Sequence, residues 1–102
     1  MKFKQGVNPF GIKSELLLAL TVADSVWARN GQELVITSLN DGKHSQTSLH
    51  YAGCAADLRI WNFTDVDAVA EILREDLGRN PDFDVVVETD HIHLEYQPKY
   101  RS

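Results

Sequence analysis

The chain has 102 residues, of which 43% are hydrophobic, so it is long enough for one compact domain and too short for two. Its 15 acidic and 10 basic residues give a net charge of -5, which disfavours a surface that binds the phosphate backbone of nucleic acid. The single cysteine, Cys54, cannot form an internal disulfide, and we expect it to be a small packing residue. We therefore expect one domain over residues 1–102 that acts as a monomer without a nucleic acid partner.

The amino-terminal segment is basic at Lys2 and Lys4, but no apolar run follows that could form the core of a signal peptide. No segment approaches the ~18 consecutive apolar residues of a membrane span. We therefore expect a protein that is synthesised in the cytoplasm and does not insert into a membrane.

Residues 14–29 form the first predicted element. Apolar side chains recur there every three to four residues, Ser14 can cap the start and Gly31 follows the end, which together predict an amphipathic helix. The β-branched run at residues 34–38 lies between Gly31 and a polar stretch. We expect a buried strand there, followed by a loop that runs to about Gly53.

Residues 55–60 predict a second strand. Because side chains alternate along a strand, Ala55, Asp57 and Arg59 would share one face and the three apolar residues that alternate with them the other. Residues 65–77 then show helical spacing of apolar side chains. Either Thr64 or Asp65 can cap this second helix, and the glycine at position 78 can end it.

The last two predicted strands, residues 83–88 and 91–96, flank a two-residue segment with the length of a tight hairpin turn. In the second of them, His91, His93 and Glu95 would face one way and the residues between them the other. The order helix, strand, strand, helix, strand, strand does not alternate as parallel βαβ units would. We therefore expect an α+β fold with an antiparallel β-sheet and two helices packed on one face.

Three of the four histidines lie in two short stretches, residues 48–57 and 88–96. A catalytic zinc ion takes three protein ligands and keeps a fourth position open for water, and His50, Asp57 and His93 supply two imidazoles and one carboxylate. With one anionic ligand such a site keeps net positive charge, which lowers the pKa of bound water and polarises a substrate carbonyl. This candidate ligand set therefore favours hydrolysis.

Attack by water also needs a base, and the two candidates are Asp90 and Glu88. His91, on the same face as His93, could stabilise the oxyanion of the reaction. Each residue also has a structural explanation, because Asp is common in turns, and Glu88 and Glu95 can be solvated cross-strand partners.

The first stretch has the pattern S-x-H-x-x-G-x-A-x-D, formed by Ser48, His50, Gly53, Ala55 and Asp57. This pattern resembles the signature of a superfamily of zinc peptidases. The superfamily includes D-Ala-D-Ala carboxypeptidases and dipeptidases, the L-alanyl-D-glutamate endopeptidases of phage lysins, and the Hedgehog signalling domain. Every position of the pattern is matched.

The second motif of that superfamily is an acid three residues before the last ligand histidine, often with a tyrosine three residues after it. Asp90, His93 and Tyr96 match it. The segment His91-Ile-His93 also resembles relatives in which the second histidine binds zinc and the first lies beside the open position. The resemblance thus implies His93 as the ligand and Asp90 as the first choice of base, whereas Glu88 resembles a glutamate set further upstream in Hedgehog-like domains.

One feature departs from the superfamily. Many members carry a glycine and a substrate-binding arginine after a Thr-Ser pair, whereas this chain has Leu39 and no arginine in the loop. Lys43 or Arg59 are the candidates to replace that arginine. Arg59 is otherwise interpreted as a structural residue, although it shares the face of Asp57 and could bind a carboxylate.

The resemblance implies a small phage-type peptidase that binds Zn²⁺ and cleaves the stem peptides of peptidoglycan. Such a lysin would reach the cell wall after release by a holin, and its partner would be the peptide substrate. Two alternatives remain, a module that binds zinc without turnover and a phage structural or assembly protein whose histidines are incidental.

Overall fold

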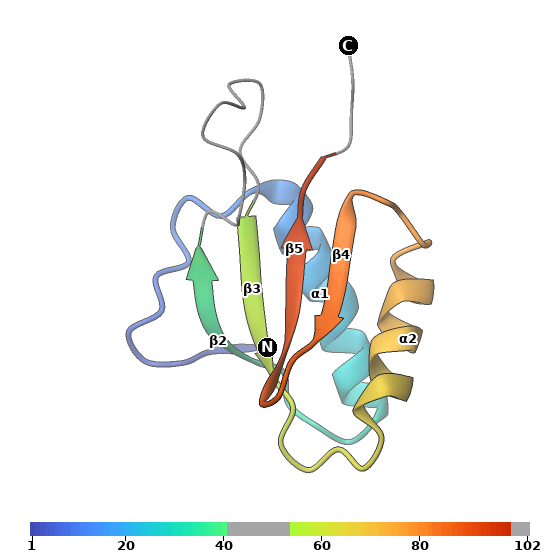
Figure 1. Ribbon diagram of the computed structural model, residues 1–102. Coiled ribbons are helices and arrows are strands. Elements are labelled where there is room, and N and C mark those ends of the chain that lie inside the picture. The colour runs from blue at the N-terminus through green and yellow to red at the C-terminus, as the bar shows by residue number, and fades with distance from the viewer. Residues whose placement is uncertain (41–53, 99–102) are drawn as a thin grey trace.

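The computed structural model describes residues 1–40 and 54–98, which form one sheet and two helices (Figure 1). The elements in chain order are β1 (Lys2–Phe3), α1 (Ser14–Arg29), β2 (Val35–Asn40), β3 (Cys54–Arg59), α2 (Val66–Asp76), β4 (Phe83–Val87) and β5 (His91–Tyr96). The strand order is β1-β2-β3-β5-β4, with β1 parallel to β2 and all other neighbours antiparallel. The fold is α+β as predicted. The sheet is mixed rather than purely antiparallel, because β1, a strand that was not predicted, pairs parallel with β2.

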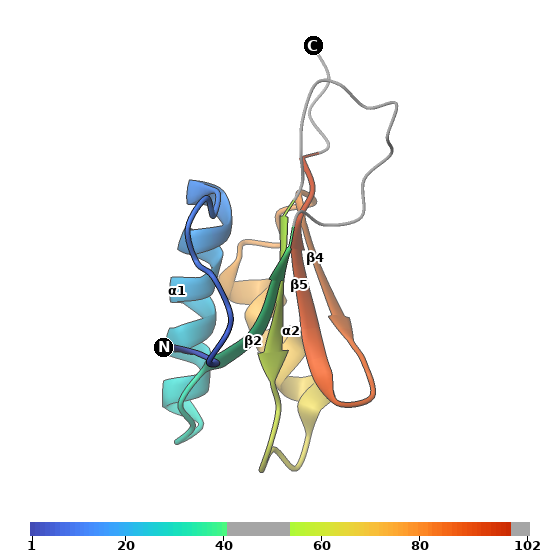
Figure 2. The ribbon, with the colours of Figure 1, turned by 90° about the vertical axis from the view of Figure 1, so that its left-hand side faces the viewer.

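Both helices pack against one face of the sheet, which leaves the other face for a site (Figure 2). The apolar stripe of α1 is buried as its spacing predicts: Leu16, Ala19, Leu20, Ala23, Val26 and Trp27. The indole Nε1 of Trp27 donates a hydrogen bond to the backbone oxygen of Arg59 at 3.0 Å, which ties α1 to the end of β3. None of the helices in this part of the chain is long and apolar enough to cross a membrane.

The ends of the two helices differ in how they are capped. Helix α1 begins at Ser14, but the residue before it is Lys13 and no side chain caps the helix, so the predicted capping role of Ser14 is wrong. At α2 the carboxylate of Asp65 accepts a hydrogen bond from the Ala68 N–H at 3.0 Å, which confirms the second predicted cap. Gly78 follows α2 with a φ of 72°, a conformation that favours glycine.

Side chains of the central strands alternate between the core and the opposite face. Leu58 on β3 and Ile92 and Leu94 on β5 are completely buried in the core formed with the helices. The predicted alternation is therefore confirmed in both strands. Their bounds also agree closely with the prediction, since β5 matches it and β3 begins and ends one residue earlier.

The position of β2 differs more from its predicted range, 34–38. The strand runs from Val35 to Asn40, and its pairing with β3 is irregular between Ile36 and Ser38. An irregularity of this kind changes which residues face the neighbouring strand, and a sequence pattern does not reveal it.

Candidate metal centre

The two central strands bring three potential metal ligands together on the face opposite the helices. Asp57 on β3 lies opposite His93 on β5, and Arg59 lies opposite His91. Because residues two apart on a strand share a face, Asp57, His91 and His93 all lie on the side that the core does not use. The register between β3 and β5 therefore builds the cluster.

Asp57 lies between the two imidazoles. Its Oδ1 is 3.0 Å from Nδ1 of His93 and 3.4 Å from Nε2 of His91. One potential ligand atom from each residue lies within 4.8 Å of the others, so the group could hold a metal ion. Two imidazole nitrogens and one carboxylate oxygen fit zinc and other first-row divalent metals. The identity of the metal does not follow from this geometry.

Two further side chains, Thr37 on β2 and Glu95 on β5, form hydrogen bonds with residues of the cluster. On β2, the hydroxyl of Thr37 donates a hydrogen bond to the backbone oxygen of Asp57 at 3.3 Å. On β5, Oε1 of Glu95 lies 2.8 Å from Nε2 of His93, the ring nitrogen that does not face Asp57. Glu95 is only 6% exposed, so the interpretation of this residue as a solvated cross-strand partner is wrong.

The pKa of His93 reflects these contacts. Burial by itself lowers the pKa, but hydrogen bonds to Glu95 and Asp57 outweigh burial and raise it above the ordinary value of a histidine. The two carboxylates thus make His93 a stronger base than a free histidine, and the same ring could bind a metal ion. In metal sites a carboxylate on the outer ring nitrogen commonly orients the histidine in the same way.

The predicted bases occupy different positions. The Asp90 carboxylate lies 2.6 Å from Nδ1 of His91, and this hydrogen bond lowers the pKa of Asp90. Asp90 lines the same cavity as His91 and Asp57, and its side chain is 85% exposed. Glu88 is also exposed and pairs through its backbone N–H with the His91 oxygen at 2.8 Å, as the hairpin predicts, but it does not line the cavity. Of the two predicted bases, only Asp90 therefore lies at the cavity.

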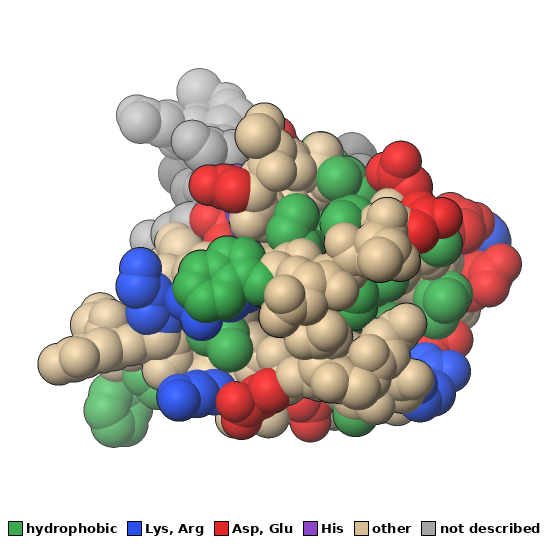
Figure 3. Space-filling model, turned by 90° about the horizontal axis from the view of Figure 1, so that it is seen from below, with side chains coloured by type: hydrophobic (Ala, Val, Ile, Leu, Met, Phe, Trp, Pro, Cys, Tyr) green, Lys and Arg blue, Asp and Glu red, His purple; other side chains and the backbone are tan. Residues whose placement is uncertain are grey.

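An open cavity of about 420 Å³ lies beside the cluster. Asp57, Asp90 and His91 form one part of its lining, and the rest includes Lys4, Thr37, Ser38, Arg59 and Trp61. The face seen from below combines exposed hydrophobic, basic and acidic side chains (Figure 3). The cavity thus opens onto two of the three potential metal ligands, Asp57 and His91, whereas His93 is not part of its lining.

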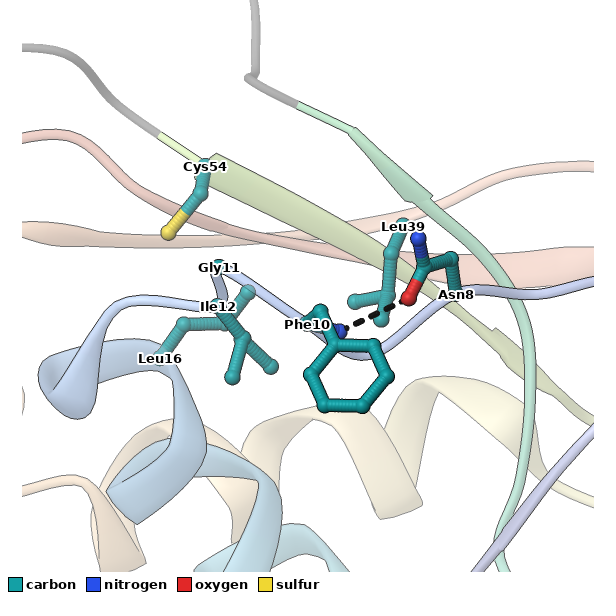
Figure 4. A pocket seen from close by; sticks show the side chains of 7 residues that line it. All are labelled: Asn8, Phe10, Gly11, Ile12, Leu16, Leu39 and Cys54. Carbon is teal, nitrogen blue, oxygen red and sulfur yellow. Dashed lines mark hydrogen bonds between the residues drawn. The ribbon is translucent and has the colours of Figure 1, made fainter.

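A second, smaller cavity of about 100 Å³ contains none of the predicted site residues (Figure 4). Apolar side chains line most of it, including Leu39 and the buried thiol of Cys54. The Phe10 N–H donates a hydrogen bond to Asn8 Oδ1 at 2.9 Å at its edge. Cys54 is buried within the core cluster, in agreement with the packing role predicted for it.

Part of the predicted ligand set lies outside the described residues. His50 falls in the segment 41–53, as do Ser48 and Gly53 of the first motif, so the ligand role of His50 stays a prediction. Of the other site residues, the structure brings together Asp57, His91, His93 and Asp90, and it adds Glu95 to them.

Comparison with known proteins identifies no family, since no family model, curated protein or solved structure matches the chain. The chain is a small α+β protein with a mixed five-stranded sheet, two helices packed against it, and an Asp57/His91/His93 cluster that could bind a metal ion.

Proposed function

We propose that this chain is a zinc-dependent peptidase that hydrolyses the stem peptides of peptidoglycan. The observation that carries the proposal is the Asp57/His91/His93 cluster at the side of an open cavity. The complete S-x-H-x-x-G-x-A-x-D pattern supports zinc as the metal and a peptide as the substrate, through its resemblance to zinc peptidases. The peptidoglycan target rests on that resemblance alone.

The ligands in this proposal are Asp57, His93 and His50. The Nδ1 atom of His93 faces Asp57, while its Nε2 can donate a hydrogen bond to Glu95, so Nδ1 is the atom left for the metal. His50, in the segment of the sequence between β2 and β3, would be the third ligand. His91 would then lie outside the ligand set, with its Nε2 3.4 Å from Oδ1 of Asp57.

A zinc ion held there would activate a water molecule and polarise the carbonyl of the scissile peptide bond. Asp90 would accept the proton of the attacking water, because its carboxylate lines the cavity beside Asp57 and His91. His91 donates a hydrogen bond to the developing oxyanion from the same side. Asp90 then passes the proton to the leaving amine.

The test has two parts, which together distinguish a zinc peptidase, a metal-binding module without activity, and a structural or assembly protein. Elemental analysis of the purified protein should find one zinc per chain in the wild type and much less in Asp57→Asn. Digestion of purified peptidoglycan with the zinc-loaded protein should release peptides that mass spectrometry identifies by the bond that was cut. Asp90→Asn is the matched control, expected to keep zinc and lose the products.

Zinc without released peptides would identify a metal-binding module instead of a peptidase. Absence of stoichiometric zinc would contradict the metal centre itself, and it would favour a structural or assembly role in which the histidines are incidental.

A further inference from the structure

Trp61 is an exposed aromatic side chain in the lining of the cavity beside the metal-ligand cluster. It is 64% exposed, whereas Trp27, the other tryptophan of the chain, is 1% exposed. Tryptophan combines a large apolar surface with a single N–H donor, and for this reason it is enriched where proteins bind ligands and partners. The exposure of Trp61 therefore asks for an explanation in terms of a ligand.

A tight turn fixes Trp61 at the surface. The strand β3 ends at Arg59, two residues before the indole. The Phe63 N–H donates a hydrogen bond to the Ile60 oxygen at 3.4 Å, which closes a four-residue turn around Trp61 and its neighbour. That neighbour, Asn62, has a φ of 70°, a left-handed conformation that asparagine adopts more readily than most residues. The turn thus presents Trp61 at its corner.

The buried Trp27 anchors both sides of this turn. Its indole N–H donates a hydrogen bond to the Arg59 oxygen at 3.0 Å, and its ring lies edge-on to Phe63, with centroids 5.4 Å apart and an angle of 85°. At the surface, the guanidinium carbon of Arg59 lies 3.9 Å from the centroid of the Trp61 ring. One face of the exposed indole is thus covered by the cation and the other is left for a ligand. An indole that is held in place before binding loses less entropy on binding.

Arg59 and Trp61 form the boundary between two cavities, because they line both of them. One is the open cavity of about 420 Å³ beside the metal-ligand cluster, and the other has a volume of about 120 Å³. The polar lining of the smaller cavity includes Gln32, Glu33 and Asn62. A ring stacked on Trp61 therefore has hydrogen-bonding side chains on both sides.

The polar groups of these linings are mostly planar, and neither sign of charge predominates. The larger cavity has two carboxylates, from Asp57 and Asp90, and two cations, from Lys4 and Arg59. Planar carboxylate, amide and guanidinium groups can form paired hydrogen bonds with neighbouring donors and acceptors. A neutral ligand with several hydroxyl groups suits such a lining better than an anion or a cation.

We propose that Trp61 stacks on a sugar ring of the glycan strand of peptidoglycan, and that polar side chains of the two cavities bind the hydroxyl groups of this sugar. A pyranose ring has an apolar face of C–H groups and a rim of hydroxyl groups, which match an indole ring and planar polar side chains, respectively. The inference rests on the proposed function for the identity of the sugar, because the stem peptides are attached to a β-linked glycan of N-acetylated hexosamines. The substrate is then held by its glycan as well as by its peptide.

A nucleobase can also stack on an indole ring, but the charges disfavour it. Nucleic acid carries a negative charge at each phosphate, whereas the chain has a net charge of -5 and two carboxylates in the larger cavity. An oligothymidylate is therefore an appropriate competing probe.

The experiment measures the binding of chitin tetrasaccharide, an oligomer of N-acetylglucosamine without a stem peptide, to the metal-free protein. A ¹⁵N NMR titration follows the two indole N–H signals of the chain, and Trp61→Leu assigns them because it removes one. Maltotetraose is the control sugar, since its α-linked glucose units have no acetamido groups.

Two further variants are compared with Trp61→Leu, and circular dichroism verifies the fold of each. Trp61→Phe keeps a smaller aromatic ring at the same position. Phe10→Leu is the matched control, because it removes an aromatic side chain that is 90% exposed but lines neither of the two cavities.

The chitin tetrasaccharide should shift the Trp61 signal and bind about tenfold more tightly to the wild type than to Trp61→Leu. Trp61→Phe should retain part of the affinity, and Phe10→Leu should bind as the wild type does. The proposal is overturned if the chitin tetrasaccharide does not bind, if Trp61→Leu binds it as tightly as the wild type, or if maltotetraose or the oligothymidylate binds at least as tightly.

The two proposals can fail separately. If the protein releases peptides from peptidoglycan but does not bind the chitin tetrasaccharide, the glycan subsite is wrong and the peptidase stands. If the tetrasaccharide binds through Trp61 but no peptide is released, the peptidase is wrong and the glycan subsite stands.

Discussion

Glu95 and His93 form a partly buried pair in which Oε1 of the carboxylate lies 2.8 Å from Nε2 of the imidazole. The pair lies along one strand, because residues two apart on β5 share a face. It directs the other ring nitrogen of His93 toward Asp57, at 3.0 Å. If His93 binds a metal, Glu95 would act on that metal by orienting the imidazole.

Replacing Glu95 with glutamine tests this role. Glu95→Gln keeps the shape of the side chain but removes its charge, so His93 becomes a weaker ligand, and we expect zinc affinity to fall about 10- to 100-fold. Competition with a chelator of known affinity measures the change, and circular dichroism verifies the fold. Glu88→Gln removes the same charge from an exposed position and should leave zinc affinity unchanged. Equal affinities for the two variants would contradict an orienting role for Glu95.

The identity of the third ligand is the subject of a second prediction. If His50 completes the site, His50→Ala should lower zinc affinity more than about 100-fold, while His91→Ala should lower it less than about tenfold. The same chelator competition measures both variants. The reverse result would mean that Asp57, His91 and His93 hold the metal by themselves, as their mutual distances would also permit.

A third prediction separates the two candidate bases. Loss of a general base typically costs about 10²- to 10⁴-fold in rate, so Asp90→Asn should reduce peptide release by that factor with zinc still bound. Glu88→Gln should retain most of the activity, because Glu88 does not line the cavity. Rates of peptide release, measured by mass spectrometry with zinc in excess, compare the two variants. Loss of activity in Glu88→Gln alone would assign the role of base to Glu88.

The sequence predicts the strand faces well because periodicity is a local property. The apolar residues Ile92 and Leu94 alternate with His91 and His93, and burial in the core selects one of the two faces. The same pattern on β3 places Asp57 on the matching face. What brings these faces together is the pairing of β3 with β5, which the predicted order of elements allows without specifying a register.

Other parts of the site depend on contacts that a local pattern does not contain. Lys2–Phe3 is too short a strand for periodicity to predict, yet its parallel pairing with β2 delivers Lys4 to the cavity. For Glu95, the alternation of side chains predicts which face of the sheet it lies on, but it does not predict how much of that face is covered by other residues. The sequence therefore did not predict that Glu95 is buried. The one available signal was its spacing of two residues from His93.

The fourth prediction concerns pH and metal-free protein. The pKa of His93 is raised above its value of 6.5 in the unfolded chain, since the effects of Glu95 and Asp57 exceed that of burial. A group whose pKa is higher in the folded state binds its proton more tightly there, so its contribution to stability is complete below the unfolded pKa. This contribution is lost as the pH rises through the folded pKa. The metal-free protein should therefore lose stability as the pH rises from below 6.5 into the alkaline range.

Zinc should reverse this dependence. The metal must displace the proton from Nδ1 of His93, so zinc affinity, and with it the stabilisation that zinc provides, should increase over the same rise in pH. Thermal unfolding at a series of pH values, with a chelator and with excess zinc, measures both trends. His93→Gln serves as the control, because it removes the titrating group and should flatten both curves. If the metal-free wild type and His93→Gln change stability with pH in the same way, other groups control the titration and His93 does not hold its proton between Asp57 and Glu95.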